Sequence, residues 1–307
     1  MINTSIVSAQ EEGILPGLSA LSESDARESA IAFVNMTTSP GLEGAIIIVD
    51  DDTRQSEQWR SSLGFDAEFT LKNQIFNGYW GLAIVGGRID DKMELIGDNG
   101  QPVHLDLTRD VVALRGSSGL SFPIDQHFKL RPFLSLVFAD LRSESTINGL
   151  YDNDNNQTIL SFNSKAQLLS AVVSVDAIYS RWYSNYRLEL SAQYNLVYTE
   201  AVSEDNPILD TDVWNSAAQL ESRISGPTNL SFAGRPWRWS AYANFTSFLS
   251  HNKSSLGYNN LMEIGASLDW QINIKPLEWF GWQSLGFRVG LIVGEKVEGY
   301  NVGLLAR

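Results

Sequence analysis

The chain has 307 residues, of which 43% are hydrophobic, 11% aromatic and 19% charged, and its formal net charge at pH 7 is −14. The absence of cysteine excludes disulfides and thiolate metal sites, and the acidic balance without a basic cluster argues against nucleic-acid binding. No stretch approaches the roughly 20 consecutive apolar residues that a membrane-spanning helix needs.

The first forty residues differ from the rest of the chain. Val7–Ala9 has the small-residue pattern that ends a secretory signal, so we interpret residues 1–9 as the remnant of a signal peptide. A cytoplasmic start with a disordered tail is the alternative. In the N-terminal segment that follows, residues 10–40, capping residues and helical spacing predict one helix over about 24–35, which Ser39–Gly41 ends.

From residue 41 to residue 307 the hydrophobic period is two. In the clearest run, 186–199, one face carries Tyr, Leu and Ala, and the other carries Arg187, Glu189 and neutral polar side chains. Successive side chains of a strand point to opposite faces, so this run predicts a two-faced sheet element. Similar runs cover about 57–70, 212–225, 236–250, 260–274 and 284–294.

The length of these runs favours a membrane. They extend over about 10–15 residues, whereas strands of water-soluble proteins have about 5–6 residues and a tilted membrane strand needs about 9–11. Aromatic residues such as Tyr186 and Tyr198 end the apolar face, as in an interfacial girdle. We therefore predict an all-β fold over residues 41–307, a transmembrane antiparallel up-and-down β-barrel of about twelve strands. A soluble β-sandwich is the alternative.

Connection lengths support the same prediction. Two-residue turns at Asp125–Gln126 and Ser184–Asn185 contrast with long polar connections, as the short periplasmic turns and longer outer loops of such barrels do. An even strand number places both termini in the periplasm. We expect the long polar connections near 50–57, 90–110, 143–165, 201–212 and 251–260, and periplasmic ones near 71–74, 226–236 and 275–283.

Charged residues share the face opposite the apolar one, which in a barrel is the lumen. The candidate lumen-lining residues are Arg60, Asp66, Glu68, Arg187, Glu189, Glu221, Arg223, Arg238, Glu263, Asp269 and Arg288. Because an isolated buried charge is costly, charges of both signs are expected to pair and fill a narrow lumen. A packed or plugged lumen is favoured over an open pore. The short N-terminal helix is the natural plug, and a periplasmic helix beside the barrel is the alternative.

Candidates for catalysis and metal binding are weak. His251 is the nearest candidate for a lipid-acting hydrolase, and a solvated loop histidine is the alternative. Asp50–Asp52 and Asp152–Asn156 offer oxygen ligands for Ca²⁺, although no Glu follows the second group at the EF-hand offset. We expect no enzyme activity, no cofactor and no metal ligand set.

The segment Phe128–Leu136, Phe-Lys-Leu-Arg-Pro-Phe-Leu-Ser-Leu, is similar to strand starts in autotransporter β-domains. With a short helix before a barrel of this size, the chain resembles the solitary autotransporter-like outer-membrane barrels over about 24–307. This resemblance implies an integral protein of a Gram-negative outer membrane, acting as a translocator, transport or surface-interaction module without a large passenger. A lipid-acting hydrolase barrel and a small diffusion porin are the alternatives.

The resemblance also implies partners. They are outer-membrane lipids, lipopolysaccharide and the barrel-assembly machinery, with no nucleic acid, and the chain is expected to be a monomer. Such barrels usually end in an aromatic residue, whereas this sequence ends in Arg307. Because Tyr300, Val302 and Leu304 are predicted to face lipid, we expect an aromatic residue at position 308 of a longer chain.

Overall fold

The computed structural model describes residues 42–51, 54–72, 75–96, 102–151, 157–204, 212–249, 258–272 and 283–306. Several predicted features lie outside these described residues. They are the signal remnant 1–9, the helix 24–35, residues 152–156, His251 and Arg307.

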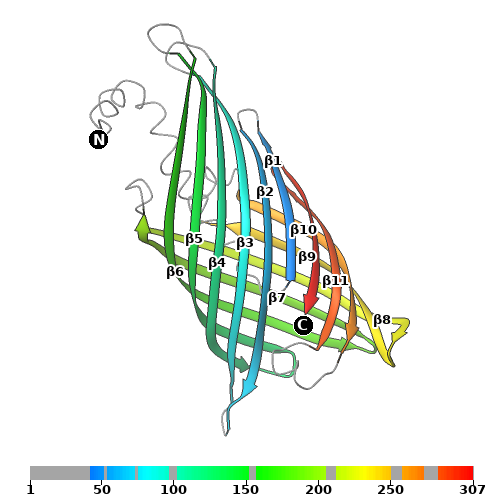
Figure 1. The fold of residues 1–307 in the computed structure, drawn as a ribbon. Helices are drawn as coiled ribbons and strands as arrows, with labels where there is room; N and C mark the ends of the chain where they lie inside the picture. The colour runs from blue at the N-terminus through cyan, green and yellow to red at the C-terminus, as the bar shows by residue number, and fades with distance from the viewer. Residues whose placement is uncertain are drawn as a thin grey trace.

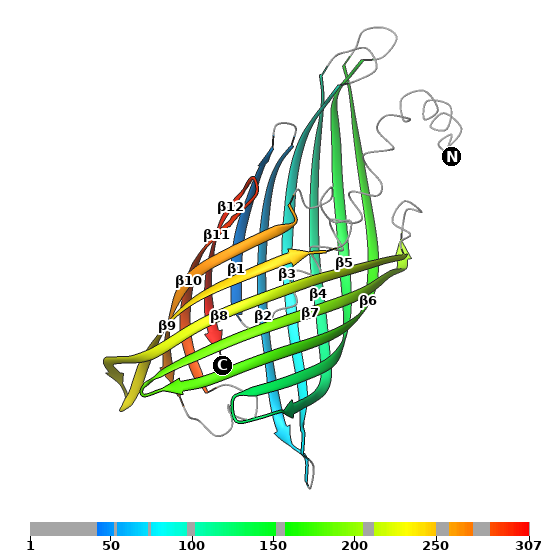
Figure 2. The ribbon, with the colours of Figure 1, turned by 180° about the vertical axis from the view of Figure 1, so that it is seen from behind.

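Twelve antiparallel strands form a closed barrel, in which each strand pairs with the next and β1 pairs with β12 (Figures 1 and 2). The predicted fold class, an up-and-down β-barrel of about twelve strands, is confirmed. The strands are β1 (Leu42–Asp51), β2 (Arg54–Thr70), β3 (Asn77–Ile96), β4 (Pro102–Pro123), β5 (Phe128–Tyr151), β6 (Gln157–Tyr183), β7 (Tyr186–Glu204), β8 (Asp212–Phe232), β9 (Arg235–Phe248), β10 (Asn260–Gln271), β11 (Ser284–Gly294) and β12 (Val297–Ala306).

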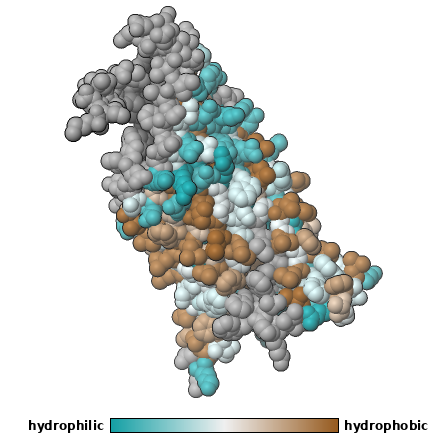
Figure 3. Space-filling model, viewed as in Figure 1, coloured by the Kyte–Doolittle hydropathy of each residue, from teal (hydrophilic) through white to brown (hydrophobic). Residues whose placement is uncertain are grey.

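Burial alternates along the strands and separates an outer from an inner face. On β11, Leu291 is 68% exposed and its neighbour Ile292 is 4% exposed, and this alternation runs through the strand. Large apolar side chains thus face outward around the barrel, and Figure 3 shows them gathered over the middle and lower part of one face. A closed barrel satisfies every strand edge, so this apolar exterior identifies a transmembrane β-barrel of the outer-membrane type.

Among the described residues, no helix is long and apolar enough to cross a membrane.

The two ends of the barrel differ in their connections. We call the end that carries residues 71–76, 124–127, 184–185 and 233–234 the turn end, at the bottom and lower right of Figure 1, and the opposite end the loop end. Ser184–Asn185 forms the predicted tight turn between β6 and β7. The turn predicted at Asp125–Gln126 lies within a four-residue connection, 124–127.

The predicted loops at 90–110 and 143–165 are wrong over most of their length. Strands β3 to β6 have 20, 22, 24 and 27 residues and extend far past their neighbours at the loop end (Figures 1 and 2). Here the alternation is inverted, because Leu105 and Leu107 face inward while His104 and Asp106 face outward. Charged side chains at every second position are typical of a strand that faces water, and they resemble a polar loop in the sequence.

The predicted connection 226–236 is likewise mostly strand. Strand β8 continues to Phe232, and the two residues Ala233 and Gly234 turn the chain into β9. Both have positive φ, 52° and 73°, as tight hairpin turns with the right-handed twist of the strands require. Pro227 is a residue typical of loops, and the pairing of β8 with β9 shifts register between Pro227 and Ser231.

The turn between β4 and β5 carries a pH-dependent stabilisation. The exposed carboxylate of Asp125 accepts hydrogen bonds from the backbone N–H groups of His127, at 2.7 Å, and Phe128, at 2.8 Å. These two bonds to the charged form, the His127 bond first, lower the pKa of Asp125 below its usual value. A lowered pKa stabilises the folded state above the unfolded pKa, and this contribution is lost as pH falls through the folded pKa.

We therefore expect Asp125→Ala to lower the urea midpoint of unfolding at neutral pH. The difference between wild type and variant should shrink as the pH falls below about 4, near the pKa of an unfolded aspartate. Unfolding curves of the two proteins across this range measure the effect. A difference that stays constant into strong acid would contradict the assignment.

Candidate functional site in the barrel lumen

The eleven predicted lumen residues lie on strands β2 and β7 to β11, on the face that alternates with the apolar exterior. Glu263, Asp269 and Arg288 are buried, and the remaining eight are not fully buried. Arg60 lies beside Gly87 of β3 and Ala45 of β1. Arg238 donates hydrogen bonds to the backbone carbonyls of Asn185 and Ser225, so it holds two turn-end hairpins together.

The structure brings several of these charges together in pairs. Arg187 lies 3.1 Å from Glu189, and Arg223 forms an ion pair with Glu221. Each pair joins two residues of the same strand that point into the lumen, because their positions differ by two. The lumen charges on β7 and β8 are therefore largely neutralised locally.

Arg131 is the centre of a second group, on β2, β3, β5 and β6. Its guanidinium lies 2.7 Å from the Asp176 carboxylate and 3.6 Å from both Asp66 and Glu68. The same guanidinium lies 4.2 Å from the centre of the Tyr79 ring, an arrangement that favours a cation. Lys129 pairs with Glu68 at 2.5 Å. The two predicted acids, Asp66 and Glu68, thus lie in a group with four residues that were not predicted for the lumen.

These omissions share one cause. The predicted charges all lie in runs where the alternation of apolar and polar residues is clear in the sequence, and β5 and β6 are outside those runs. Leu134 faces lipid, so residues at odd-numbered positions of this strand lie on the opposite face. This alternation places Arg131 and Lys129 on the inner face. Asp176 follows by the same count from Val173 and Val175.

A third group surrounds Glu263 on β9 to β11. The Tyr242 hydroxyl donates a hydrogen bond to Glu263 at 2.7 Å, and Arg288 donates one at 3.0 Å. Arg288 also stacks over the Tyr242 ring, 4.0 Å from its centre. Gly265 and Gly290 make room for the Tyr242 hydroxyl, since a Cβ at either position would overlap it. The two glycines allow a large ring to lie against the barrel wall.

The most buried ion pairs lie near the loop end. The Asp91 side chain is 0% exposed and accepts two hydrogen bonds from Arg54 Nη2, at 2.9 and 3.0 Å, and one from Arg54 Nε. Arg109 donates a further hydrogen bond to the second oxygen of Asp91. This carboxylate therefore joins two arginines from strands on either side of β3.

An apolar inner wall covers much of the barrel interior between these groups. We use this name for the cluster of Val85, Ile89, Val111, Ala113, Val137, Ala139, Leu141, Ala166, Leu168, Val172 and Val197, with Ala201 and Val213 packed against it. Its members come from β3 to β7, and each of the eleven buried residues is only 1–3% exposed. A water-filled pore is lined by polar groups. The residues predicted to line the lumen are all charged, so this apolar wall was not predicted from the sequence.

Hydroxyl groups of neighbouring strands also pair on the inner face. Ser240 and Ser267 lie 2.6 Å apart, and Ser267 donates to Asp269 at 2.9 Å. His104 faces outward on β4, and His127 lies in the 124–127 turn with its ring 6.0 Å from that of Tyr179. In the part of the chain that the structure describes, no three His, Asp or Glu residues are grouped as a metal site requires.

No protein-family model matches the chain, and no curated protein matches its sequence. Solved structures with a similar arrangement include the β-domain of the Bordetella autotransporter BrkA, at 13% identity and a TM-score of 0.49, covering 87% of this chain and 98% of that one. Another is the translocator domain of autotransporter NalP from Neisseria meningitidis, at 11% identity, a TM-score of 0.46, and coverage of 99% and 97%. The CymD monoaromatic hydrocarbon channel, at 8% identity and a TM-score of 0.47, covers 92% of this chain and 91% of its own. The likeness is one of barrel architecture.

Proposed function

We propose that the chain is an autotransporter-like translocator or transport barrel of a Gram-negative outer membrane, with its own N-terminal segment, residues 10–40, held in the lumen. The observation that carries the proposal is the burial of the apolar inner wall. The role that we propose for the barrel is transport and not catalysis.

The size of the barrel makes this burial informative. Eight strands enclose a space that side chains alone just fill, and twelve strands enclose a wider one. The inner wall consists mainly of Val and Ala, such as Val111, Ala113 and Ala139, which are too short to reach across a wider lumen. A covering segment with apolar side chains accounts for their burial. Residues 10–40 contain Leu18, Ile31 and Phe33 and lead into β1.

The ion pairs of the inner face favour a lumen that is filled by residues 10–40 over an open pore for diffusing solutes. Arg131, Glu263 and Asp91 are each engaged by neighbouring side chains, so these charges are already neutralised within the barrel wall. We further propose a monomer with both termini in the periplasm, assembled by the barrel-assembly machinery and surrounded by outer-membrane lipids and lipopolysaccharide.

Removal of residues 10–40 tests the proposal. In planar bilayers we expect the full chain to show no resolved single-channel steps and the shortened chain to show discrete openings, because the lumen would then fill with water. A matched control removes residues 152–156, the connection between β5 and β6, and should leave the closed state unchanged.

Two other outcomes would contradict the proposal that residues 10–40 close the lumen. Equal conductance of the full and shortened chains would indicate a diffusion porin whose lumen is open without any deletion. Openings that follow removal of residues 152–156 as readily as removal of residues 10–40 would assign the closure to the loop end instead. Heat-modifiable gel migration of each protein checks that the barrel has folded.

A further inference from the structure

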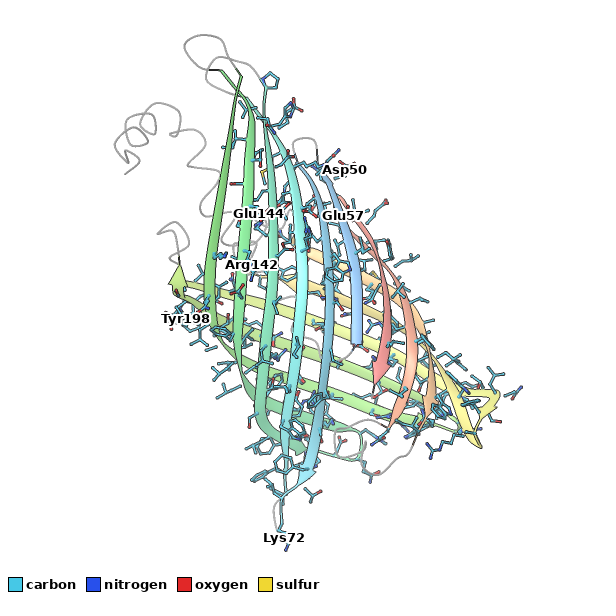
Figure 4. All side chains as sticks on the ribbon, viewed as in Figure 1. Asp50, Glu57, Lys72, Arg142, Glu144 and Tyr198 are labelled. Carbon is cyan, nitrogen blue, oxygen red and sulfur yellow. The ribbon has the colours of Figure 1, made fainter. Side chains whose placement is uncertain are left out.

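The outward-facing charges differ in sign between the two ends of the barrel. At the loop end the acidic side chains predominate, and Figure 4 shows Asp50, Glu57 and Glu144 on this side of the molecule. At the turn end the described outward or exposed cations are Lys72, Arg181 and Arg235, and Asp125 is engaged by backbone N–H groups. Exposed acidic residues toward the loop end are Asp50, Glu57, Glu94, Asp106, Asp110, Glu144, Glu200, Glu295 and Glu298, and the exposed cations there are Arg88, Lys92, Arg142, Lys165 and Lys296.

Arg181 and Arg235 each lie against an aromatic ring on the outer surface. Arg181 lies 5.0 Å from the centre of the Tyr183 ring on β6, and Arg235 lies 6.0 Å from that of Trp270. Trp270 in turn packs edge-on against Phe232, with ring centres 5.5 Å apart, and its indole N–H donates to the Phe232 carbonyl at 3.1 Å. The rings thus fix the positions of two guanidinium groups.

Neither guanidinium is neutralised by a carboxylate of the described residues. Across the ranges that the structure describes, Arg181 and Arg235 form no ion pair with a carboxylate, whereas the loop-end Arg88 and Arg142 pair with Asp90 and Asp140. Next to Arg235 the surface is apolar, since its pairing partner Phe232 is 63% and Leu230 57% exposed. Arg181 pairs with Leu188, whose other neighbour, Ile224, is 43% exposed. A cation beside an exposed apolar surface fits a ligand with an anionic head and a hydrocarbon tail.

We propose that Arg181 on β6 and Arg235 on β9 are two separate binding positions for the phosphate groups of anionic glycerophospholipids in the leaflet at the turn end. Arginine binds phosphate oxygens through its fork of N–H donors, and Trp and Tyr rings sit at the level of lipid headgroups. The acyl chains then lie along Phe232, Leu230 and Trp239. The proposal rests on the membrane orientation given above, with the turn end toward the periplasm.

The acidic charges of the loop end favour binding of anionic phospholipids in the leaflet at the turn end over binding in the opposite leaflet. Phosphates of the opposite leaflet would meet the carboxylates of Asp50, Glu57 and Glu298, which repel an anion. At the turn end the described outward charges attract it. Each arginine near an anionic lipid surface raises the association constant by about fivefold, and salt screens this effect.

Spin-labelled lipids measure the preference directly. The full chain is reconstituted in phosphatidylcholine vesicles, and the association of labelled phosphatidylglycerol is compared with that of labelled phosphatidylcholine. We expect the wild type to prefer phosphatidylglycerol, and Arg181→Gln with Arg235→Gln to reduce that preference by about fivefold or more. Arg181→Lys with Arg235→Lys should retain part of it, because the charge remains.

The matched control is Arg88→Gln with Arg142→Gln, which removes two outward arginines at the loop end and should leave the preference unchanged. Equal binding of both lipids by the wild type would overturn the proposal, and so would an equal loss in the control. A preference for lipopolysaccharide that depends on Arg181 and Arg235 would also overturn it. Because this readout does not involve conductance, its failure is distinct from failure of the plug proposal, and heat-modifiable migration confirms folding.

Discussion

Replacing Asp91 with asparagine is expected to lower the free energy of unfolding of the barrel by about 3–5 kcal/mol, the cost of breaking a buried ion pair by removing one partner. The Asp91 side chain is fully buried and joins Arg54 and Arg109. Asparagine keeps the shape but removes the charge and one acceptor oxygen. Two guanidinium groups then remain in a region of low exposure, where a charge is expensive to hold.

The neighbouring residue provides a matched control. Asp90 faces outward and pairs with Arg88 at 3.0 Å, with the two side chains 42% and 51% exposed. An exposed ion pair contributes at most about 1 kcal/mol, so Asp90→Asn should have a small effect. Urea unfolding in lipid vesicles, followed by tryptophan fluorescence, compares the two variants. An equal decrease in the free energy of unfolding for both variants would mean that the burial of Asp91 does not determine the cost of its replacement.

A second large effect is expected at Gly265, which lies beneath the Tyr242 ring. In Gly265→Ala the new Cβ would overlap the Tyr242 hydroxyl and the backbone carbonyl of Val289, a partner on the paired strand. The ring must then move, and its hydrogen bond to Glu263 is strained or lost. Overpacking of this kind costs about 1–3 kcal/mol.

Gly116→Ala is the control for this substitution, because a Cβ there would have no heavy atom within 4 Å. A surface change of this type should alter stability by less than about 0.5 kcal/mol. The temperature at which heat-modifiable migration is lost measures both variants. Combining Gly265→Ala with Tyr242→Ala should give less than the sum of the single losses, since the ring that is overlapped is gone. Strict additivity would show that Tyr242 is not the obstacle.

Much of the fold follows from a simple pattern. Alternation in runs such as 186–199 and 284–294 predicts about twelve strands. It also predicts which side of each strand faces lipid, because lipid-exposed positions must be apolar. Tyr300, Val302 and Leu304 face outward as predicted. The pattern failed at 102–110, where inward Leu105 and Leu107 alternate with charged outward residues, because the solvent outside the barrel changes there from lipid to water.

The contacts within the lumen were harder to predict from this alternation. Parity along a strand predicts which side chains enter the lumen, and it selected Glu263 and Arg288 in this way. It does not predict that they meet across β10 and β11, or that Tyr242 joins them, because this depends on register and closure. The same alternation places Arg131 on the inner face, although it lies outside the runs that contain the predicted charges.

The sequence by itself determined the strand periodicity, the closed-barrel class and the side of each clear strand that faces lipid. These are local properties, because the alternation of side chains by two needs no knowledge of neighbouring strands. Only the tertiary structure decided which charges pair, as in the meeting of Arg131 on β5 with Asp66 on β2, and how far β3 to β6 extend beyond the apolar belt. Such contacts join residues far apart in the chain, and their distances follow from strand register and barrel closure.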